Sequence, residues 1–198
     1  QKMKKAAITR LNILQKAFEL IYEKGYLTTS IDEILATTQV TKGAFYYHFK
    51  NKDEMGIAII NELLKPTFEI NFLEPLRNLT GDPLVMLYDM MYGILMENEV
   101  MTVEHGCPAS NFTQEMAPWN VDFTAALNGL SNQWKQAIAD AVERGKQNGY
   151  VRQDVDGEQV AVFVLSGYWG IRNMGKLVNN ESVYVTYLHQ FKSYLESL

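Results

Sequence analysis

The stretch TKGAFYYHFKNKDEM, residues 41–55, gathers side chains that are suited to binding an anion. All five positions from Phe45 to Phe49 carry an aromatic or imidazole ring, and lysines flank them on both sides. Tyrosine hydroxyls, imidazole N–H groups and ammonium groups bind phosphate oxygens, whereas rings without polar tips anchor a helix in a core. This composition favours contact with a polyanion rather than catalysis.

The other reactive side chains do not form a catalytic or metal-binding pattern. The histidines are His48, His105 and His189, and the sequence contains neither a glycine-rich phosphate loop nor a GxSxG motif. Glu104, His105 and Cys107 are spaced too tightly for a usual zinc site, and no second cluster completes the set. We therefore expect a protein that is not an enzyme and needs no metal or cofactor.

The composition is typical of a globular protein in a reducing compartment. The 198 residues are 47% hydrophobic, which suffices for a compact domain with a small appendage. No apolar run approaches the ~20 residues of a membrane span, and no signal-peptide pattern follows the N-terminal lysines. The single cysteine, Cys107, excludes an internal disulfide. We expect a cytoplasmic protein that does not contact membranes.

The charge is distributed unevenly along the chain. Residues 1–55 hold nine Lys/Arg and six Asp/Glu, whereas residues 56–198 hold nine Lys/Arg and seventeen Asp/Glu. A basic head on an acidic body indicates that only the head meets a polyanion. A protein that binds DNA without sequence preference is not expected to have a net charge of −5.

Helical periodicity accounts for nearly the whole chain, and no strand pattern is convincing. Gly25 is a candidate C-cap, and Ser30 with Glu33 has the spacing of a capping box. Asp82–Pro83 is a typical helix start, because proline is tolerated at the first helical position. We expect an all-α fold. The first helix ends near Gly25, and the later helices cover residues 30–37, 41–49, 51 towards 66, 83 past 95, a stretch that begins at 108, and about 121–147, 156–177 and 181–198.

Two short helices joined by a tight turn, Ser30–Thr37 and Thr41–Phe49, are typical of a helix-turn-helix motif. In that motif the second helix lies in the major groove, with its N-terminal residues at base edges. Lys52 follows in the first turn of the next helix, where a cation opposes the helix dipole unless a phosphate docks there. Phe45 and Phe49 are expected to face the core of the head.

The segment TTSIDEILATTQVTKGAFYYHFKNKDEM closely resembles the DNA-binding head of the TetR family of transcriptional repressors. Residues 40–49 and Lys52 match the family pattern in register. The resemblance implies a three-helix DNA-binding domain at residues 1–52, followed by a larger helical effector-binding and dimerisation domain at residues 53–198. It also implies DNA contacts by the following residues: Thr29 or Ser30, Thr41, Lys42, Gly43, Ala44, Tyr46, Tyr47, His48 and Lys52.

Membership in this family further implies a function for the whole chain. The protein would bind a pseudo-palindromic double-stranded operator as a homodimer, most often as a repressor. A small-molecule effector, apolar or aromatic in this case, would release the DNA.

One residue departs from the family pattern. Family members commonly have glycine in the turn before Val40, whereas this chain has Gln39. If that position needs a positive φ, glutamine adds strain that glycine avoids.

The last two predicted helices have features of a dimer face. Val160–Leu165 is apolar all round, and Ser166, Gly167 and Gly170 permit close helix approach. The alternative is that both helices only close the core of one chain. The last helix carries a wide apolar stripe formed by Tyr184, Tyr187, Leu188, Phe191, Tyr194 and Leu195.

Methionine and aromatic residues are abundant in the body. Such side chains line adaptable apolar cavities, although they also form ordinary cores. The candidate effector-binding residues are Met91, Tyr92, Cys107, Phe112, Trp119, Trp134, Tyr168 and Trp169.

Cys107 has a second interpretation. It directly precedes Pro108, and at the N-cap of a helix the dipole favours the thiolate. Some TetR-family sensors respond to electrophiles or oxidants through a cysteine in a similar Gly-Cys context, and Lys176 is a candidate amine neighbour. The alternative is a small buried residue that packs a helix start.

Overall fold

The computed structural model describes residues 2–78 and 80–198, and all regular structure in these residues is helical. The predicted all-α fold is confirmed. The chain forms two compact units: unit 1 contains the described residues up to Pro66 together with Pro108–Leu127, and unit 2 contains Thr67–Cys107 together with Asn128–Leu198. Within the described chain, no helix combines the length and apolar character that crossing a membrane requires.

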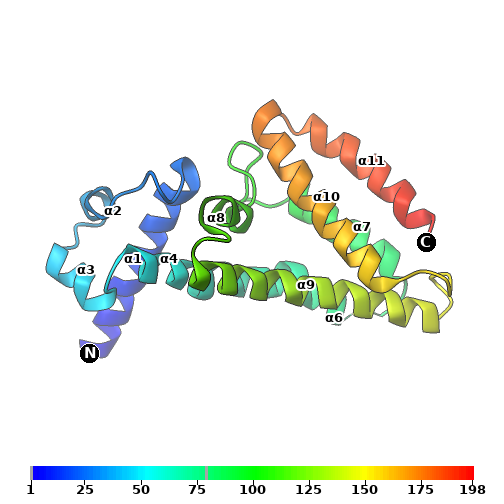
Figure 1. The fold of residues 1–198 in the computed structure, drawn as a ribbon, viewed down its shortest axis with the longest axis horizontal. Helices are drawn as coiled ribbons and strands as arrows, with labels where there is room; N and C mark the ends of the chain where they lie inside the picture. The colour runs from blue at the N-terminus through cyan, green and yellow to red at the C-terminus, as the bar shows by residue number, and fades with distance from the viewer. Residues whose placement is uncertain (1, 79) are drawn as a thin grey trace. The chain divides into compact units, whose positions relative to one another are not determined.

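The N-terminal part of unit 1 is a three-helix head made by α1 (Lys2–Lys24), α2 (Ile31–Thr38) and α3 (Lys42–His48) (Figure 1). The last residue of α1 is followed by Gly25, whose φ of 99° is a conformation that glycine adopts at little cost. The predicted C-cap is therefore present. Fully buried apolar side chains from all three helices form the core of the head: Ile13, Leu14, Ala17, Ile34 and Phe45.

Unit 1 extends beyond this head through α4 (Lys52–Ile59), α8 (Pro108–Met116) and the first part of α9 (Val121–Gln147). It is thus larger than the DNA-binding domain expected at residues 1–52. Residues that are distant in sequence complete it, and the local pattern of the head did not indicate them.

An aromatic cluster joins these later segments to the head. The ring centroid of Tyr26 lies 5.7 Å from that of Phe112 and 5.1 Å from that of Phe123. Helix α4 approaches the cluster closely at Gly56, where a Cβ would lie 2.6 Å from the Phe123 ring. A side chain at this position would displace the cluster.

Helix α4 leads without a break through η1 (Ile60–Leu64), α5 (Lys65–Phe68), η2 (Glu69–Leu73) and α6 (Glu74–Arg77). The sequence predicted a helix that ends towards residue 66, and this end point was wrong. The two η segments are π-helical turns, which are wider than α-helical turns.

Each π-helical segment is followed closely by a proline. After η1, the N–H group of Lys65 donates to a carbonyl five residues earlier, and the next residue is Pro66. After η2, the N–H group of Glu74 does the same, and the next residue is Pro75. In a regular α-helix, a proline ring clashes with the carbonyl four residues earlier. We infer that the wider turns accommodate both prolines, so the helix continues where proline usually ends it.

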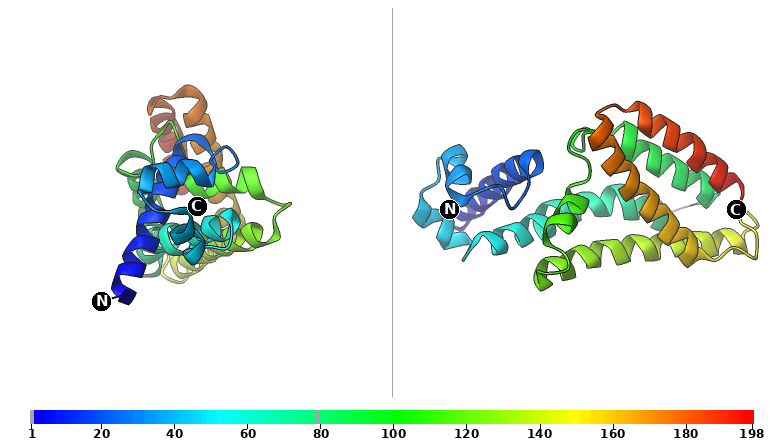
Figure 2. Two further views of the ribbon diagram at one scale, coloured as in Figure 1. Left: turned by 90° about the vertical axis from the view of Figure 1, so that its left-hand side faces the viewer. Right: turned by 45° about the horizontal axis from the view of Figure 1, so that its top comes forward.

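Unit 2 is built mainly by α7 (Pro83–Met96), the C-terminal part of α9, α10 (Gly157–Val178) and α11 (Ser182–Glu196). Helix α11 lies against both α7 and α10 (Figures 1 and 2). Gly167 permits the close approach of α10 and α11, since a Cβ there would lie 2.5 Å from the Tyr187 hydroxyl.

The aromatic stripe of α11 faces the core of unit 2. Tyr184, Leu188, Phe191 and Leu195 are buried, and Tyr187 is half-buried. The stripe is a predicted part of a dimer face, but in the structure it closes the core of the protomer. A group of exposed apolar side chains lies on α10, on a face that we call its outer face: Val162, Phe163, Met174 and Leu177.

Candidate nucleic-acid interface and effector region

Both helices of the predicted helix-turn-helix motif begin at side-chain caps. The Ser30 hydroxyl accepts a hydrogen bond from the N–H of Glu33 at 3.2 Å, and the Glu33 carboxylate accepts one from the N–H of Ser30 at 2.8 Å. Thr41 accepts a hydrogen bond from the N–H of Ala44 at 3.2 Å. The predicted capping box is present, and these caps determine where α2 and α3 begin.

The turn between the two helices contains a strained residue. Gln39 has φ 56° and ψ 21°, which is the left-handed conformation. This conformation costs a non-glycine residue about 1–2 kcal/mol. The hypothesis that the position needs a positive φ is confirmed, and the strain at glutamine is the expected consequence.

Helix α3 has one buried face and one exposed face. Phe45 and Phe49 are buried, as predicted, with ring centroids 5.6 Å apart. Lys42, Tyr46 and Tyr47 are exposed, and 78% of Tyr47 is accessible to solvent. The buried rings hold the helix in place, while a charge and two phenol hydroxyls remain available on its surface.

Arg10 of α1 fixes the C-terminal end of α3. Its Nη1 donates to the backbone carbonyl of His48 at 3.0 Å, and its guanidinium carbon lies 4.4 Å from the centroid of the Phe49 ring. Its Nη2 pairs with Glu62 at 2.5 Å. Burial, and secondly the charge of Arg10, lower the pKa of His48. The lowered pKa favours the neutral imidazole, and the contacts of Arg10 attach the C-terminal end of α3 to α1.

Lys52 is the first residue of α4, as predicted, and a neighbouring ring stabilises its charge. Its ammonium group lies 4.2 Å from the centroid of the Tyr26 ring, and the Tyr26 hydroxyl donates to the Asp53 carboxylate. A cation over an aromatic face is stabilised, which offsets the opposing helix dipole. Burial lowers the pKa of Lys52. The role of Tyr26 was not apparent in the sequence.

Thr29 is the predicted DNA contact that the structure places in the interior. Its side chain is buried and its hydroxyl donates to the carbonyl of Gly25 at 2.7 Å. It therefore stabilises the loop between α1 and α2 instead of facing a phosphate. Ser30 is exposed, although its hydroxyl caps α2. The other predicted contacts lie at the start of α3, along α3 or at the start of α4.

Glu115 of α8 binds the same loop, and sequence analysis did not single it out. Its carboxylate accepts hydrogen bonds from the N–H groups of Tyr26 at 2.8 Å and Leu27 at 3.1 Å. Asn120 donates to Asp53 at 3.3 Å. The segment from α8 to α9 thus holds the residues that position Lys52.

Unit 2 brings together three of the eight predicted effector residues. The ring centroids of Trp134 and Tyr168 are 5.2 Å apart, and the Tyr168 hydroxyl interacts with Cys107, which is 7% exposed. Phe72 packs against both rings, with centroids 4.9 Å from Trp134 and 5.8 Å from Tyr168. We call Phe72, Trp134 and Tyr168 the body cluster.

The other predicted effector residues lie elsewhere. Met91 is buried on α7, whereas Tyr92 and Trp169 are partly exposed. Phe112 belongs to the aromatic cluster of unit 1, and the exposed Trp119 donates its indole N–H to the carbonyl of Glu115 at 2.8 Å. Phe112 and Trp119 therefore belong to a different unit from the body cluster.

Arg172 is a buried residue that sequence analysis missed. It is 1% exposed, and it donates to the carbonyl of Ile94 at 2.7 Å and to the Tyr184 hydroxyl at 3.2 Å. It follows Tyr168 by four residues and Leu165 by seven, so the helical period places it on the buried face of α10. A charged residue at the helical spacing of the buried apolar residues is the sequence signal that could have identified Arg172 as buried.

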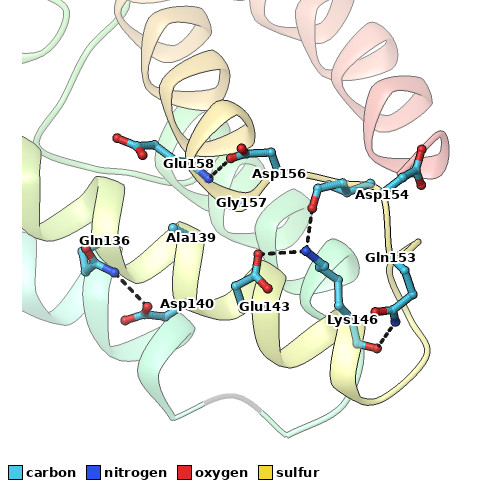
Figure 3. A pocket seen from close by; sticks show the side chains of 11 residues that line it. Gln136, Ala139, Asp140, Glu143, Lys146, Gln153, Asp154, Asp156, Gly157 and Glu158 are labelled. Carbon is cyan, nitrogen blue, oxygen red and sulfur yellow. Dashed lines mark hydrogen bonds and ion pairs between the residues drawn. The ribbon is translucent and has the colours of Figure 1, made fainter.

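A polar cleft of about 460 Å³ lies in unit 2 at the N-terminal end of α10 (Figure 3). Asp156 in its wall caps α10 by accepting from the N–H of Glu158 at 2.9 Å, and Lys146 donates to Glu143 at 3.1 Å and to the carbonyl of Val155 at 2.8 Å. These contacts serve the helix start and the loop before it. No set of acidic, histidine and cysteine side chains in the described residues is arranged to hold a metal ion.

Both parts of the chain match known family models. Residues 13–59 match the model for bacterial regulatory proteins of the tetR family, and residues 84–191 match the tetracyclin repressor-like C-terminal domain. The first match contains the helix-turn-helix motif, and the second contains most of unit 2.

Relatives and solved structures agree with these matches. The chain is 30% identical over 179 residues to the transcriptional regulator AcuR of Cereibacter sphaeroides, covering 87% of this chain and 78% of AcuR. It is 33% identical over 132 residues to an uncharacterised HTH-type transcriptional regulator of Lactococcus lactis, covering 67% of each protein. A regulatory protein TetR from Rhodobacter sphaeroides superposes with a TM-score of 0.79 at 26% identity, covering 94% of this chain and 98% of that one. The chain therefore belongs to the TetR family of bacterial transcriptional regulators.

Proposed function

We propose that this protein is a repressor that binds a pseudo-palindromic operator as a homodimer and leaves it when a small apolar or aromatic effector binds. DNA binding is assigned to residues 1–52, and effector binding with dimerisation to residues 53–198. The observation that carries the proposal is the division of α3 into a buried face, with Phe45 and Phe49, and an exposed face with a lysine and two tyrosines. The protein acts where the chromosome is, in the cytoplasm, with no membrane partner.

The docking mode follows from that division. The N-terminal end of α3, Thr41–Ala44, reads base edges in the major groove, where small side chains allow the backbone to approach. The polar tips further along the helix and at the start of α4 bind phosphates, which sets the register of the head on the duplex. The phosphate-binding residues in this mode are Ser30, Tyr46, Tyr47, His48 and Lys52.

A second copy of the chain is the partner proposed for the outer face of α10. Val162, Phe163, Met174 and Leu177 are exposed there, and a Cβ at Gly170 would meet open space. An apolar helix face opposite the core indicates an association surface. Two heads are also needed to contact half-sites about 34–36 Å apart or at multiples of that spacing.

Selection of bound fragments from genomic DNA, followed by footprinting of the best fragment, tests the proposal. A protected palindrome with two half-sites supports a dimeric operator-binding protein. Absence of any enriched sequence, also after unfolding and refolding to remove bound ligand, would refute sequence-specific DNA binding.

A second effector mode, electrophile or oxidant sensing through Cys107, is favoured by the position of this thiol. Cys107 lies beside Tyr168 in unit 2 and directly before Pro108, the first residue of α8 in unit 1. The side chain of Lys176 lies next to Gly106, since its Cδ is 3.0 Å from where a Gly106 Cβ would be. Modification of the buried sulfur would displace its neighbours in unit 2.

Treatment with N-ethylmaleimide distinguishes the two modes. If Cys107 is the sensor, the reagent releases the parent protein from its operator and leaves Cys107→Ser bound. Equal release of both proteins, or release of neither, would exclude thiol sensing and leave the effector-binding mode.

A further inference from the structure

Neutral groups are the partners that the described structure provides for the Arg172 guanidinium. Nη2 donates to the carbonyl of Ile94 at 2.7 Å, and Nη1 donates to the Tyr184 hydroxyl at 3.2 Å. The guanidinium carbon also lies 5.4 and 5.3 Å from the ring centroids of Tyr168 and Tyr184. The Ile94 carbonyl is in the last turn of α7, where carbonyls lack helical partners. These contacts explain why the two Nη atoms lie where they do.

The contacts leave the charge and the third nitrogen of Arg172 unexplained. No carboxylate in the described residues pairs with Arg172, and its Nε–H has no hydrogen-bond partner there. A buried cation without an anion is unfavourable, and an unsatisfied N–H adds to the cost. The aromatic faces of two tyrosines compensate only part of it.

A second unsatisfied donor lies near the same ring. The indole N–H of Trp134, a side chain that is 2% exposed, also has no partner in the described structure. The Trp134 ring centroid lies 5.2 Å from that of Tyr168, and the Arg172 guanidinium lies 5.4 Å from the same centroid. Tyr168 is thus flanked by a buried cation with a free N–H and by a buried indole with a free N–H.

The chemistry of these groups selects a class of ligand. Both free groups are donors and one carries a positive charge, so the complementary group is an anionic acceptor. A carboxylate has two acceptor oxygens and a single charge, which matches one guanidinium and one indole. The surrounding rings of the body cluster favour an apolar or aromatic remainder on the same molecule.

We propose that Arg172 and Trp134 bind the carboxylate of a small monocarboxylic acid whose apolar part lies against Phe72 and Tyr168. This inference rests on the proposed function as an effector-responsive regulator and names the chemical class of the effector. Because the three rings of the body cluster contact one another, the ligand must separate them to enter. Binding is thereby coupled to a rearrangement of unit 2.

Titration of the full-length protein with acetate, hexanoate and benzoate, followed by ¹H–¹⁵N NMR of the side chains, tests the proposal directly. At least one of these acids is expected to shift the Arg172 Nε–H and Trp134 Nε1–H resonances together. Trp119 provides an internal control, because it lies in unit 1 and its indole resonance should stay in place. The neutral amide of the same acid should bind at least about tenfold more weakly, since it lacks the charge.

Two variants separate binding from folding. Trp134→Phe keeps a ring in the cluster but removes the indole N–H, and should weaken carboxylate binding about threefold to tenfold. Arg172→Met should abolish detectable binding, with circular dichroism used to verify that the variant is folded. A purely structural Arg172 would instead lower the melting temperature without any response of the parent protein to carboxylates.

Three results would overturn the proposal: no acid of the series binds, the amide binds as tightly as the acid, or Trp134→Phe and a folded Arg172→Met bind the acid like the parent. Operator selection without added acid tests the proposed function separately. If an operator is found but no acid binds, the regulator assignment stands and the ligand class falls. If an acid binds but no operator is found, the ligand class stands and the proposed operator binding falls.

Discussion

Two sets of aromatic residues in this protein have opposite organisation. The four aromatic residues of the α3 region, residues 45–49, come from one short segment and divide between a buried and an exposed face. The body cluster collects Phe72, Trp134 and Tyr168 from η2, α9 and α10, and all three are buried. The first set presents polar tips to solvent, whereas the second contains a buried indole N–H that has no hydrogen-bond partner among the described residues.

The difference shows how far local rules reach. Which face of α3 a residue occupies follows from the helical period, so composition and spacing suffice to assign it. The body cluster depends on the packing of helices that are far apart in sequence. We therefore expect single substitutions in the head to separate stability from DNA binding, and substitutions in the body to affect the core or association.

Substitution at Phe45 and Tyr47 gives the sharpest test of the division of α3. Phe45→Ala should destabilise the protein by about 3–5 kcal/mol, because a fully buried ring is lost. Tyr47→Ala should change stability by less than about 0.5 kcal/mol, yet weaken operator binding. Denaturant unfolding and DNA titration measure the two effects. Similar stability losses in both variants would contradict the two-faced arrangement.

Val162→Glu tests the outer face of α10. A charge in the centre of an apolar interface should convert the dimer to monomers and lower operator affinity at least about tenfold, because the two heads no longer bind together. Sedimentation and DNA titration report the two quantities. Val85→Glu is the matched control, since Val85 is also exposed in unit 2 but lies on α7. A dimeric Val162→Glu protein would place the interface elsewhere.

Lys52→Ala tests the phosphate contact at the start of α4. Operator affinity should fall about threefold to tenfold, and the salt dependence of binding should decrease by the equivalent of about one phosphate contact. Tyr46→Phe, which removes only a hydroxyl, should weaken binding less and leave the salt dependence unchanged. Lys192→Ala is the control, because Lys192 also lies near a tyrosine ring, Tyr88, but in unit 2. Parent-like binding by Lys52→Ala and Tyr46→Phe would refute the docking mode.

Gln39→Gly tests the strain in the turn of the head. Glycine adopts the left-handed conformation at low cost but loses more chain entropy on folding, so a net stabilisation of about 0.5–1 kcal/mol is expected. Asn179→Gly is the counterpart in unit 2, where φ is 50°. Asparagine tolerates this conformation better than glutamine, so its replacement should gain less. Thermal unfolding of both variants ranks the two strains.

The smallest expected effect concerns Glu33 in the capping box. A hydrogen bond from Lys24, followed by those from Ser30, lowers the pKa of Glu33 to about 2 from its ordinary value of 4.5. A carboxylate with a depressed folded-state pKa stabilises the protein above pH 4.5, and this contribution is lost as the pH falls from 4.5 towards 2. Glu33→Gln should therefore be less stable than the parent at pH 7, with the gap closing in that window. A stability difference between the parent and Glu33→Gln that does not change with pH would show that the charge of Glu33 does not contribute.

The head could be predicted from its sequence in considerable detail. The capping box at Ser30, the C-cap at Gly25, the buried Phe45 and Phe49 and the positive φ at residue 39 are all present. Each depends on neighbours within a few residues, so the local chemistry determines it. Thr29 is the predicted DNA-contact residue that the structure places in the interior, where its hydroxyl donates to the Gly25 carbonyl.

The body could be predicted only as a succession of helices. Proline usually ends a helix, but the π turns before Pro66 and Pro75 allow it to continue to Arg77. The apolar stripe of α11 was compatible with either a core or an interface, and the packing against α7 and α10 decided for the core. Periodicity identifies an apolar face but does not identify the surface that covers it.

The sequence by itself determined the helical class, the caps, the family and the two faces of α3, because each depends on residue type and short spacing. The tertiary structure decided which distant segments complete each unit and where the apolar surface of α10 remains exposed. It also decided that Arg172 is buried with no carboxylate partner among the described residues. The reason is that burial and pairing depend on contacts between residues far apart in the chain, such as Arg172 with Ile94 or Glu115 with Tyr26. Local sequence patterns determine where the helices lie in the chain, and helix packing determines which distant residues contact one another.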